Sequence, residues 1–191
     1  DPTLWMVLVA AVIVILILGG HNTFYVYIAP YLIDAAGFAE PSVALILFLY
    51  GGAGAIGVVV AGIVGDRFPR GGLIGMVALA TVSMGALAWV SASQLWVTVL
   101  VMVWAAAFGG IPALLQLRLL RAASVRLRDF ASSVLVTAFN LGIGGGALVG
   151  ALLYDRLGVA TLAVVGSAGF AIAIVTAVVA DAVERSQEPR P

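Results

Sequence analysis

Few side chains in this sequence could take part in chemistry, and the first of them form a polar group inside a long apolar stretch. His21, the only histidine, is followed by Asn22 and Tyr25, and all three fall within one sector of a helix at about 100° per residue. A polar sector on an apolar helix is expected to face protein or a water-filled cavity, and a histidine there could carry a proton near neutral pH. The three residues are therefore predicted to line a substrate cavity, with a hydrogen-bonded helix contact as the alternative.

Two amides are further candidates for this cavity. Gln116 and Asn140 each lie in an apolar stretch, and each can donate and accept hydrogen bonds between helices. For either amide, substrate contact and a hydrogen bond that bridges helices are equally expected.

No group of residues predicts an enzyme. Residues 52–57 match the dinucleotide pattern G-x-G-x-x-G, but they lie inside one apolar run, whereas that pattern needs a preceding strand. Ser167 lies in the order G-S-x-G rather than G-x-S-G, and the only histidine is far upstream. Because the chain has no cysteine, thiolate metal sites are excluded, and we predict no catalytic residue, no metal and no cofactor.

Composition places these residues in a membrane. The chain has 191 residues, of which 63% are hydrophobic and 9% charged, and its mean hydropathy is +1.20. An average soluble domain carries about 25% charged residues. Net charge is zero and the chain has no basic cluster, so no nucleic-acid partner is expected. The lipid bilayer is the predicted surrounding.

The apolar runs predict an all-α polytopic membrane protein with six transmembrane helices. Crossing roughly 30 Å of hydrocarbon takes about 20 helical residues. The expected spans are 4–33, 43–65, 73–90, 95–120, 130–154 and 159–180, within a bundle of residues 1–181 that is followed by a polar tail at 182–191. The first span is long enough to require a tilt or a bend at Gly19-Gly20, and Pro112 predicts a bend in the fourth.

Arginine positions predict the orientation. There is no lysine, and eight of the nine basic residues fall on the side of the two termini, leaving Arg156 alone on the other side. The eight are Arg67, Arg70, Arg118, Arg121, Arg126, Arg128, Arg185 and Arg190. By the positive-inside rule, both termini are expected in the cytoplasm, with Arg118 near the inner interface.

Two glycine-rich spans that both end in Asp-Arg indicate an internal repeat. When Asp155-Arg156 is aligned with Asp66-Arg67, Gly146 falls on Gly57. The two spans run in opposite directions across the membrane, so the chain is predicted to be a 3+3 inverted repeat, the build of secondary transporters with alternating access. The glycines of these spans are expected to form close, sliding helix contacts. They include Gly54, Gly57, Gly142, Gly146 and Gly150.

Several stretches resemble a known family. GIVGDRFPRGG at residues 62–72 resembles the G-x-x-x-D-R-x-G-R signature of the major facilitator superfamily, with Pro69 where glycine is usual. YIAPYLIDAAGF, LLQLRLLRAA and SSVLVTAFNLGIGGGALVGALLYDRLG look like the second half of a bacterial drug:proton or sugar-efflux antiporter. The resemblance implies half of a major-facilitator fold, helices seven to twelve, in a bacterial inner membrane. It further implies a small-molecule substrate, protons, and a missing N-terminal six-helix half as partners.

The same resemblance gives a role to the turn after the second span. It implies that Asp66, Arg67 and Arg70 form a charge contact that holds one gate state, whereas the alternative is that the arginines only anchor the loop at the membrane surface. Every acidic residue lies near a span end, so the carboxylate that couples proton movement is expected in the missing half.

Two other functions stay open from the sequence. A complete six-helix chain could pair with a second copy of itself to make a transporter. Alternatively, the chain could be a membrane-embedded structural or regulatory module that transports nothing.

Overall fold

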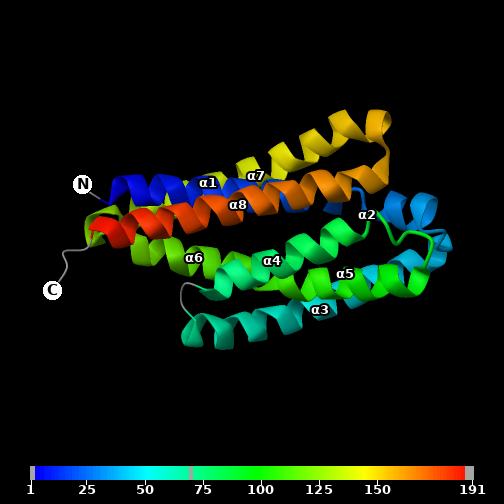
Figure 1. Ribbon diagram of the computed structural model, residues 1–191, viewed down its shortest axis with the longest axis horizontal. Helices are drawn as coiled ribbons and strands as arrows, with labels where there is room; N and C mark the ends of the chain where they lie inside the picture. Colours follow the sequence, from blue (N-terminus) through cyan, green and yellow to red (C-terminus); the bar gives the residue numbers. More distant parts are fainter. Residues whose placement is uncertain (1–2, 69–70, 188–191) are drawn as a thin grey trace.

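The computed structural model describes residues 3–68 and 71–187, and its regular elements there are all helices (Figure 1). The helices are α1 (Leu4–Tyr25), α2 (Ile28–Pro30), α3 (Glu40–Arg67), α4 (Gly71–Ala86), α5 (Gln94–Gly109), α6 (Ile111–Ala122), α7 (Arg128–Leu157) and α8 (Val159–Gln187). A π-helical segment covers Tyr31–Ala35, and a 3-10 turn covers Val125–Leu127.

Five helical stretches of the described chain are long and apolar enough to cross a membrane. They are Leu4–Tyr25, Glu40–Arg67, Gln94–Leu119, Val125–Leu157 and Val159–Val183. The apolar helix α4 is shorter, with 16 residues. Large apolar side chains such as Phe48 and Val59 remain exposed on the outside of the bundle, as lipid-facing side chains do. The predicted class, an all-α multi-pass membrane protein, is confirmed.

The first span breaks at a different place from the one predicted. Helix α1 continues through Gly19 and Gly20 and ends at Tyr25. The break follows from Pro30, because proline has no N–H to donate to the carbonyl four residues earlier, at Val26. The chain instead closes a tighter turn, in which the Tyr27 N–H donates to the Phe24 carbonyl at 2.9 Å.

The fourth span breaks next to Pro112, where a bend was expected. Helix α5 ends at Gly109 and α6 begins at Ile111, so Gly110 is the junction. A Cβ on Gly110 would lie 2.7 Å from the Gly57 carbonyl oxygen of α3. The junction therefore needs a residue without a side chain as well as the proline.

The third span is shorter than predicted at its second end. Helix α4 stops at Ala86, and residues 87–89 form turns in which each N–H donates three residues back rather than four. The Leu87 carbonyl accepts a hydrogen bond from the Tyr31 hydroxyl at 2.6 Å. This side-chain bond replaces one that a continued helix would have supplied, so within the predicted span 73–90 the helix ends at residue 86.

Replacing Tyr31 with phenylalanine is expected to destabilise the fold by about 1–2 kcal/mol. The ring is fully buried and would stay in place, but the Leu87 carbonyl would lose its donor in an apolar surrounding. The measurement is the midpoint of unfolding in SDS. Tyr154→Phe is the matched control because Tyr154 is only partly buried, and equal midpoints for the two variants would contradict this role of the Tyr31 hydroxyl.

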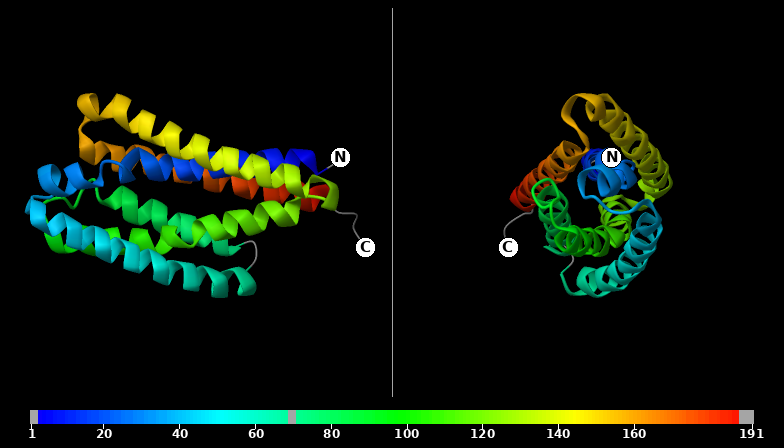
Figure 2. Two further views of the ribbon diagram at one scale, coloured as in Figure 1. Left: turned by 180° about the vertical axis from the view of Figure 1, so that it is seen from behind. Right: turned by 90° about the vertical axis from the view of Figure 1, so that its right-hand side faces the viewer.

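The helices pack as two related groups (Figures 1 and 2). Helix α1 packs on α7 and α8, and α5 packs on α3 and α4. When the first three spans are exchanged in order with the last three, the contacts of α1 with α7 and α8 become the contacts of α5 with α3 and α4. Helices α3 and α7 run in opposite directions along the bundle, and both termini lie at one end (Figure 1). The arrangement is the predicted 3+3 inverted repeat.

Small residues bring the equivalent helices into close contact. A Cβ on Gly146 of α7 would lie 2.9 Å from the Gly19 Cα of α1. In the other repeat, a Cβ on Gly57 of α3 would lie 2.8 Å from the Ala106 carbonyl carbon of α5. The two crossings therefore correspond under the repeat, and both depend on backbone contact.

The remaining predicted glycines lie along the same two crossings. A Cβ on Gly142 would lie 2.7 Å from the Leu18 Cβ, and one on Gly150 would lie 2.6 Å from the Thr23 carbonyl oxygen. Gly54 is less tight, because its Cβ would lie 3.7 Å from the nearest atom of α5. Sliding along these faces stays a prediction.

Candidate functional site

Five rings from three helices meet inside the bundle, and we call them the aromatic cluster: His21 and Tyr25 of α1, Tyr50 of α3, and Trp104 and Phe108 of α5. His21 stacks on Phe108 with ring centroids 3.5 Å apart and planes at 6°. The ring centroid of Trp104 lies 5.1 Å from that of His21 and 5.4 Å from that of Tyr50. The ring centroids of Tyr25 and Tyr50 are 5.2 Å apart.

Helical spacing explains how the cluster forms. His21 and Tyr25 are four residues apart on α1, and Trp104 and Phe108 are four apart on α5, so each pair lies on one face of its helix. The close crossing of α3 and α5 then brings Tyr50 against Trp104. The cluster is completed where the α1 pair meets the α5 pair, through the contact of His21 with Phe108.

The cluster lies where the two repeats meet. His21 follows Gly19 by two residues, and Phe108 follows Ala106 by two, so they occupy equivalent positions beside the two crossings. Their rings touch, which places them on the axis that relates the repeats. In an inverted repeat this axis lies in the membrane plane, and transporter substrate sites are found near it, at mid-depth.

Three buried polar atoms of the cluster have no protein partner. Among the described residues, the buried side-chain atoms without a hydrogen bond are His21 Nδ1, Tyr50 OH and Trp104 Nε1. An unpaired buried polar group costs about 1–3 kcal/mol, so three of them in one place are expensive for a purely structural core. The cluster can offer ring faces for stacking, the indole as a donor, and the hydroxyl and imidazole as donors or acceptors.

The other predicted cavity residues do not join the cluster. Asn22 is buried, but its Nδ2 donates to the Leu18 carbonyl of its own helix at 2.9 Å. Asn140 is exposed and donates to the Val136 carbonyl at 2.8 Å. Gln116 is exposed on α6. The structure therefore brings together only His21 and Tyr25 of the five.

Three residues of the cluster were not predicted from the sequence. Tyr50, Trp104 and Phe108 are aromatic residues in apolar spans, where they are typical of core packing. One signal could have found two of them, because the four-residue spacing of Trp104 and Phe108 places both rings on one face of a helix.

The predicted turn lies at the end of α3. Asp66 and Arg67 are exposed, and the Arg67 guanidinium carbon lies 6.0 Å from the Phe68 ring centroid. The one ion pair found among residues 3–68 and 71–187 joins Arg118 to Asp181 and does not involve this turn. Arg70 and Pro69 lie outside the described residues.

Comparison with known proteins agrees with this architecture. The chain is 28% identical over 170 residues to a probable sugar efflux transporter of Mannheimia succiniciproducens, an overlap of 89% of this chain and 43% of the relative. It is 31% identical over 157 residues to a probable sugar efflux transporter of Helicobacter pylori strain J99, covering 82% of this chain and 40% of the relative. It is 34% identical over 154 residues to a chloramphenicol efflux pump of Mycobacterium tuberculosis, covering 76% and 37%.

The chain spans about two fifths of the length of these curated relatives. A sequence model of the family described as Major Facilitator Superfamily matches residues 5–191, nearly the whole chain. With its inverted helical repeat and this match, the chain belongs to the Major Facilitator Superfamily.

Proposed function

We propose that this chain is the C-terminal six-helix half of a transporter that exports a small uncharged molecule, and that the substrate binds at the aromatic cluster. The observation that carries the proposal is the gathering of three unpartnered buried polar atoms among ring faces on the repeat axis. The cluster contains no carboxylate or guanidinium, which favours an uncharged ligand. The direction of transport rests on the names of the relatives, which are efflux proteins.

The polar outer face of α7 supports a second bundle beside this one. Asn140, Ser133 and Thr137 are exposed there, and each bonds only a carbonyl one turn earlier in its own helix. Amides and hydroxyls within a bilayer normally face protein or a water-filled cavity rather than lipid. We assign this face to the missing N-terminal half. The alternative is that a second copy of the chain packs on this face, which requires the purified chain to be a dimer. A strictly monomeric chain would exclude this alternative.

Coupling to protons by alternating access belongs to the same proposal. Aspartates of the described chain lie near helix ends, as Asp66, Asp129 and Asp155 do, so the coupling carboxylate is assigned to the other half. Asp66 and Arg67 are assigned to a contact that holds one gate state. The asymmetry of arginines supports an orientation with both termini in the cytoplasm. The bacterial relatives support a location in a bacterial inner membrane.

Tyr50→Phe is expected to lower efflux about fivefold or more without lowering stability. The substitution keeps the ring and removes only a hydroxyl that has no protein partner, so any loss must come from the substrate. The measurement is the accumulation of radiolabelled chloramphenicol, and in a separate assay of a radiolabelled sugar, in cells that express the complete gene product. A second readout is the unfolding midpoint of the purified protein.

Tyr154→Phe is the matched control, because Tyr154 contacts Tyr27, in the turn after α1, and takes no part in the cluster. Unchanged efflux in Tyr50→Phe would overturn the cluster as substrate site. A proton ionophore tests the second part of the proposal, which is proton antiport. Efflux that continues after the proton gradient has collapsed would rule out proton antiport.

A further inference from the structure

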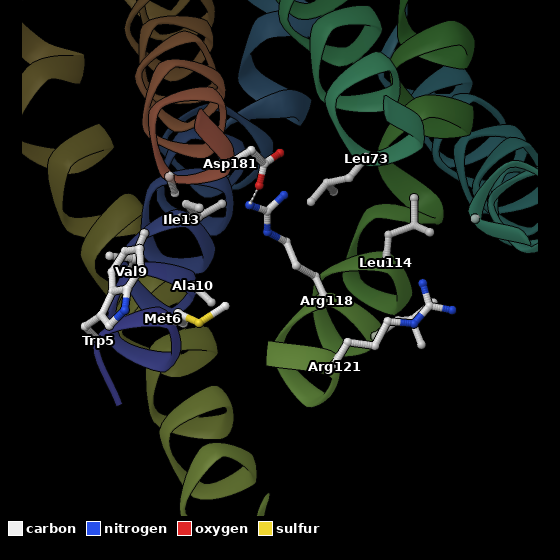
Figure 3. Close-up of a pocket in the computed structure, with 13 residues that line it drawn as sticks. Trp5, Met6, Val9, Ala10, Ile13, Leu73, Leu114, Arg118, Arg121 and Asp181 are labelled. Atoms are coloured by element: carbon white, nitrogen blue, oxygen red, sulfur yellow. Dashed lines mark hydrogen bonds and ion pairs between the residues drawn. The ribbon is translucent and has the colours of Figure 1, made fainter. Parts of the chain in front are cut away.

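A separate pocket lies at the end of the bundle where α1 begins and α8 ends (Figure 3). Its volume is about 240 Å³. The lining comes from five helices and includes Met6, Val9 and Ile13 of α1, Arg118 and Arg121 of α6, and Asp181 of α8. The aromatic cluster shares none of these residues.

One side of the pocket is charged. The Arg118 guanidinium of α6 points across it and donates to the Asp181 carboxylate of α8 (Figure 3). Arg121, one turn further along α6, is exposed and belongs to no ion pair within the described ranges. Because the aspartate neutralises one of the two arginines, the lining carries a single net positive charge.

The other side of the pocket is apolar. Met6, Val9 and Ile13 of α1 line this side, and Trp5 of the same helix also belongs to the lining (Figure 3). A soluble anion would satisfy the arginines but leave this wall without a partner. A ligand that fits both sides has one negative charge next to an apolar part.

The position of the pocket favours a lipid as the source of that ligand. Helices α3 and α6 end, and α7 begins, at the same end of the bundle (Figure 1), so Arg67, Arg126 and Arg128 lie near this end as well. Basic pockets between the ends of transmembrane helices are suited to anionic headgroups, and each arginine near the surface contributes about 1 kcal/mol to attraction of anionic lipids. Leu117 and Arg121 are exposed, so the pocket is open at this end.

We propose that this pocket binds a monoanionic phospholipid, with its phosphodiester at Arg118 and Arg121 and the first part of an acyl chain along Met6, Val9 and Ile13. The single negative charge of the phosphodiester matches the net charge of the lining. The site is independent of the aromatic cluster and of what the protein transports.

The test is quenching of tryptophan fluorescence by brominated lipids added to the purified protein in detergent. Brominated phosphatidylglycerol is expected to quench at lower concentration than brominated phosphatidylcholine, and Trp5→Phe should remove this difference because Trp5 is the tryptophan in the pocket. Arg121→Gln should raise the half-quenching concentration of phosphatidylglycerol about fivefold, which corresponds to about 1 kcal/mol, because the phosphodiester loses a charge-assisted hydrogen bond. Arg121 is exposed and unpaired, so this variant should fold even where Arg118→Gln does not.

Arg128→Gln is the matched control, with the same charge change at the start of α7 and outside the pocket. An equal loss in Arg121→Gln and Arg128→Gln would show general surface attraction and overturn the site. Equal quenching by the two lipids would overturn it as well. If millimolar inorganic phosphate abolished the preference for phosphatidylglycerol, the occupant would be a soluble anion and the lipid proposal would be wrong.

Discussion

Replacing Gly146 with alanine is expected to lower the stability of the bundle by about 1–3 kcal/mol. The new methyl group would lie 2.9 Å from the Gly19 Cα and also within contact distance of the Gly19 carbonyl, and neither backbone atom can move without shifting α1. The crossing of α1 and α7 is the most extensive helix contact of the fold, so a shift there propagates along both helices. The measurement is the midpoint of unfolding in SDS, followed by far-UV circular dichroism.

Neighbouring glycines of the same helix provide the control. Gly144 and Gly145 have nothing within 4 Å of an added Cβ, so alanine at either position should leave the midpoint unchanged or raise it slightly. The inverted repeat extends the test to the α3–α5 crossing. Gly57→Ala should destabilise this crossing in the same way, whereas Gly52→Ala should leave it unchanged because nothing lies within 4 Å of an added Cβ there. A Gly146→Ala midpoint equal to that of Gly145→Ala would contradict backbone contact at this crossing.

Arg118→Gln is expected to cost about 2–4 kcal/mol. The variant leaves the Asp181 carboxylate, only 10% exposed, without its counter-ion between α6 and α8. Asp181→Asn should cost less, because the long Arg118 side chain is 22% exposed and can extend its charge towards water. The same SDS titration measures both variants.

A charge reversal tests whether the pair itself is responsible. Arg118→Asp combined with Asp181→Arg should recover part of the stability that either single reversal loses, since the two charges again face each other. Arg121→Gln removes the same charge one turn away and should leave the midpoint close to that of the unmodified protein. If the double reversal were as unstable as the sum of the single ones, the ion pair would not be what holds α6 to α8.

Sequence was sufficient for the class and the symmetry of the fold. The excess of apolar residues left a membrane as the only plausible solvent, and the aligned Asp-Arg ends revealed the repeat because they mark equivalent helix termini. Helix breaks were harder to predict. Gly19-Gly20 does not interrupt α1, since in an apolar surrounding no water competes for the backbone hydrogen bonds, whereas Pro30 interrupts the span because its N–H is missing.

Two of the five residues of the aromatic cluster were accessible from the sequence. His21 and Tyr25 stand out because they are polar and share a helix face, but Tyr50, Trp104 and Phe108 acquire significance only when the helices pair. Periodicity also gives the angle of a side chain around its helix without saying which direction faces the bundle. Asn140 and Gln116, predicted to line the same cavity as His21, lie on exposed faces of this chain, and their contact with a substrate stays a prediction.

The early end of α4 has a consequence for the surrounding lipid. Its 16 residues extend about 24 Å, less than the roughly 30 Å of hydrocarbon in an average bilayer. Non-helical backbone at that depth must be shielded from lipid, and the turns after Ala86 with the Tyr31 hydroxyl supply that shielding. Helix α4 is therefore the element of the described bundle at which a mismatch between helix length and bilayer thickness is expected.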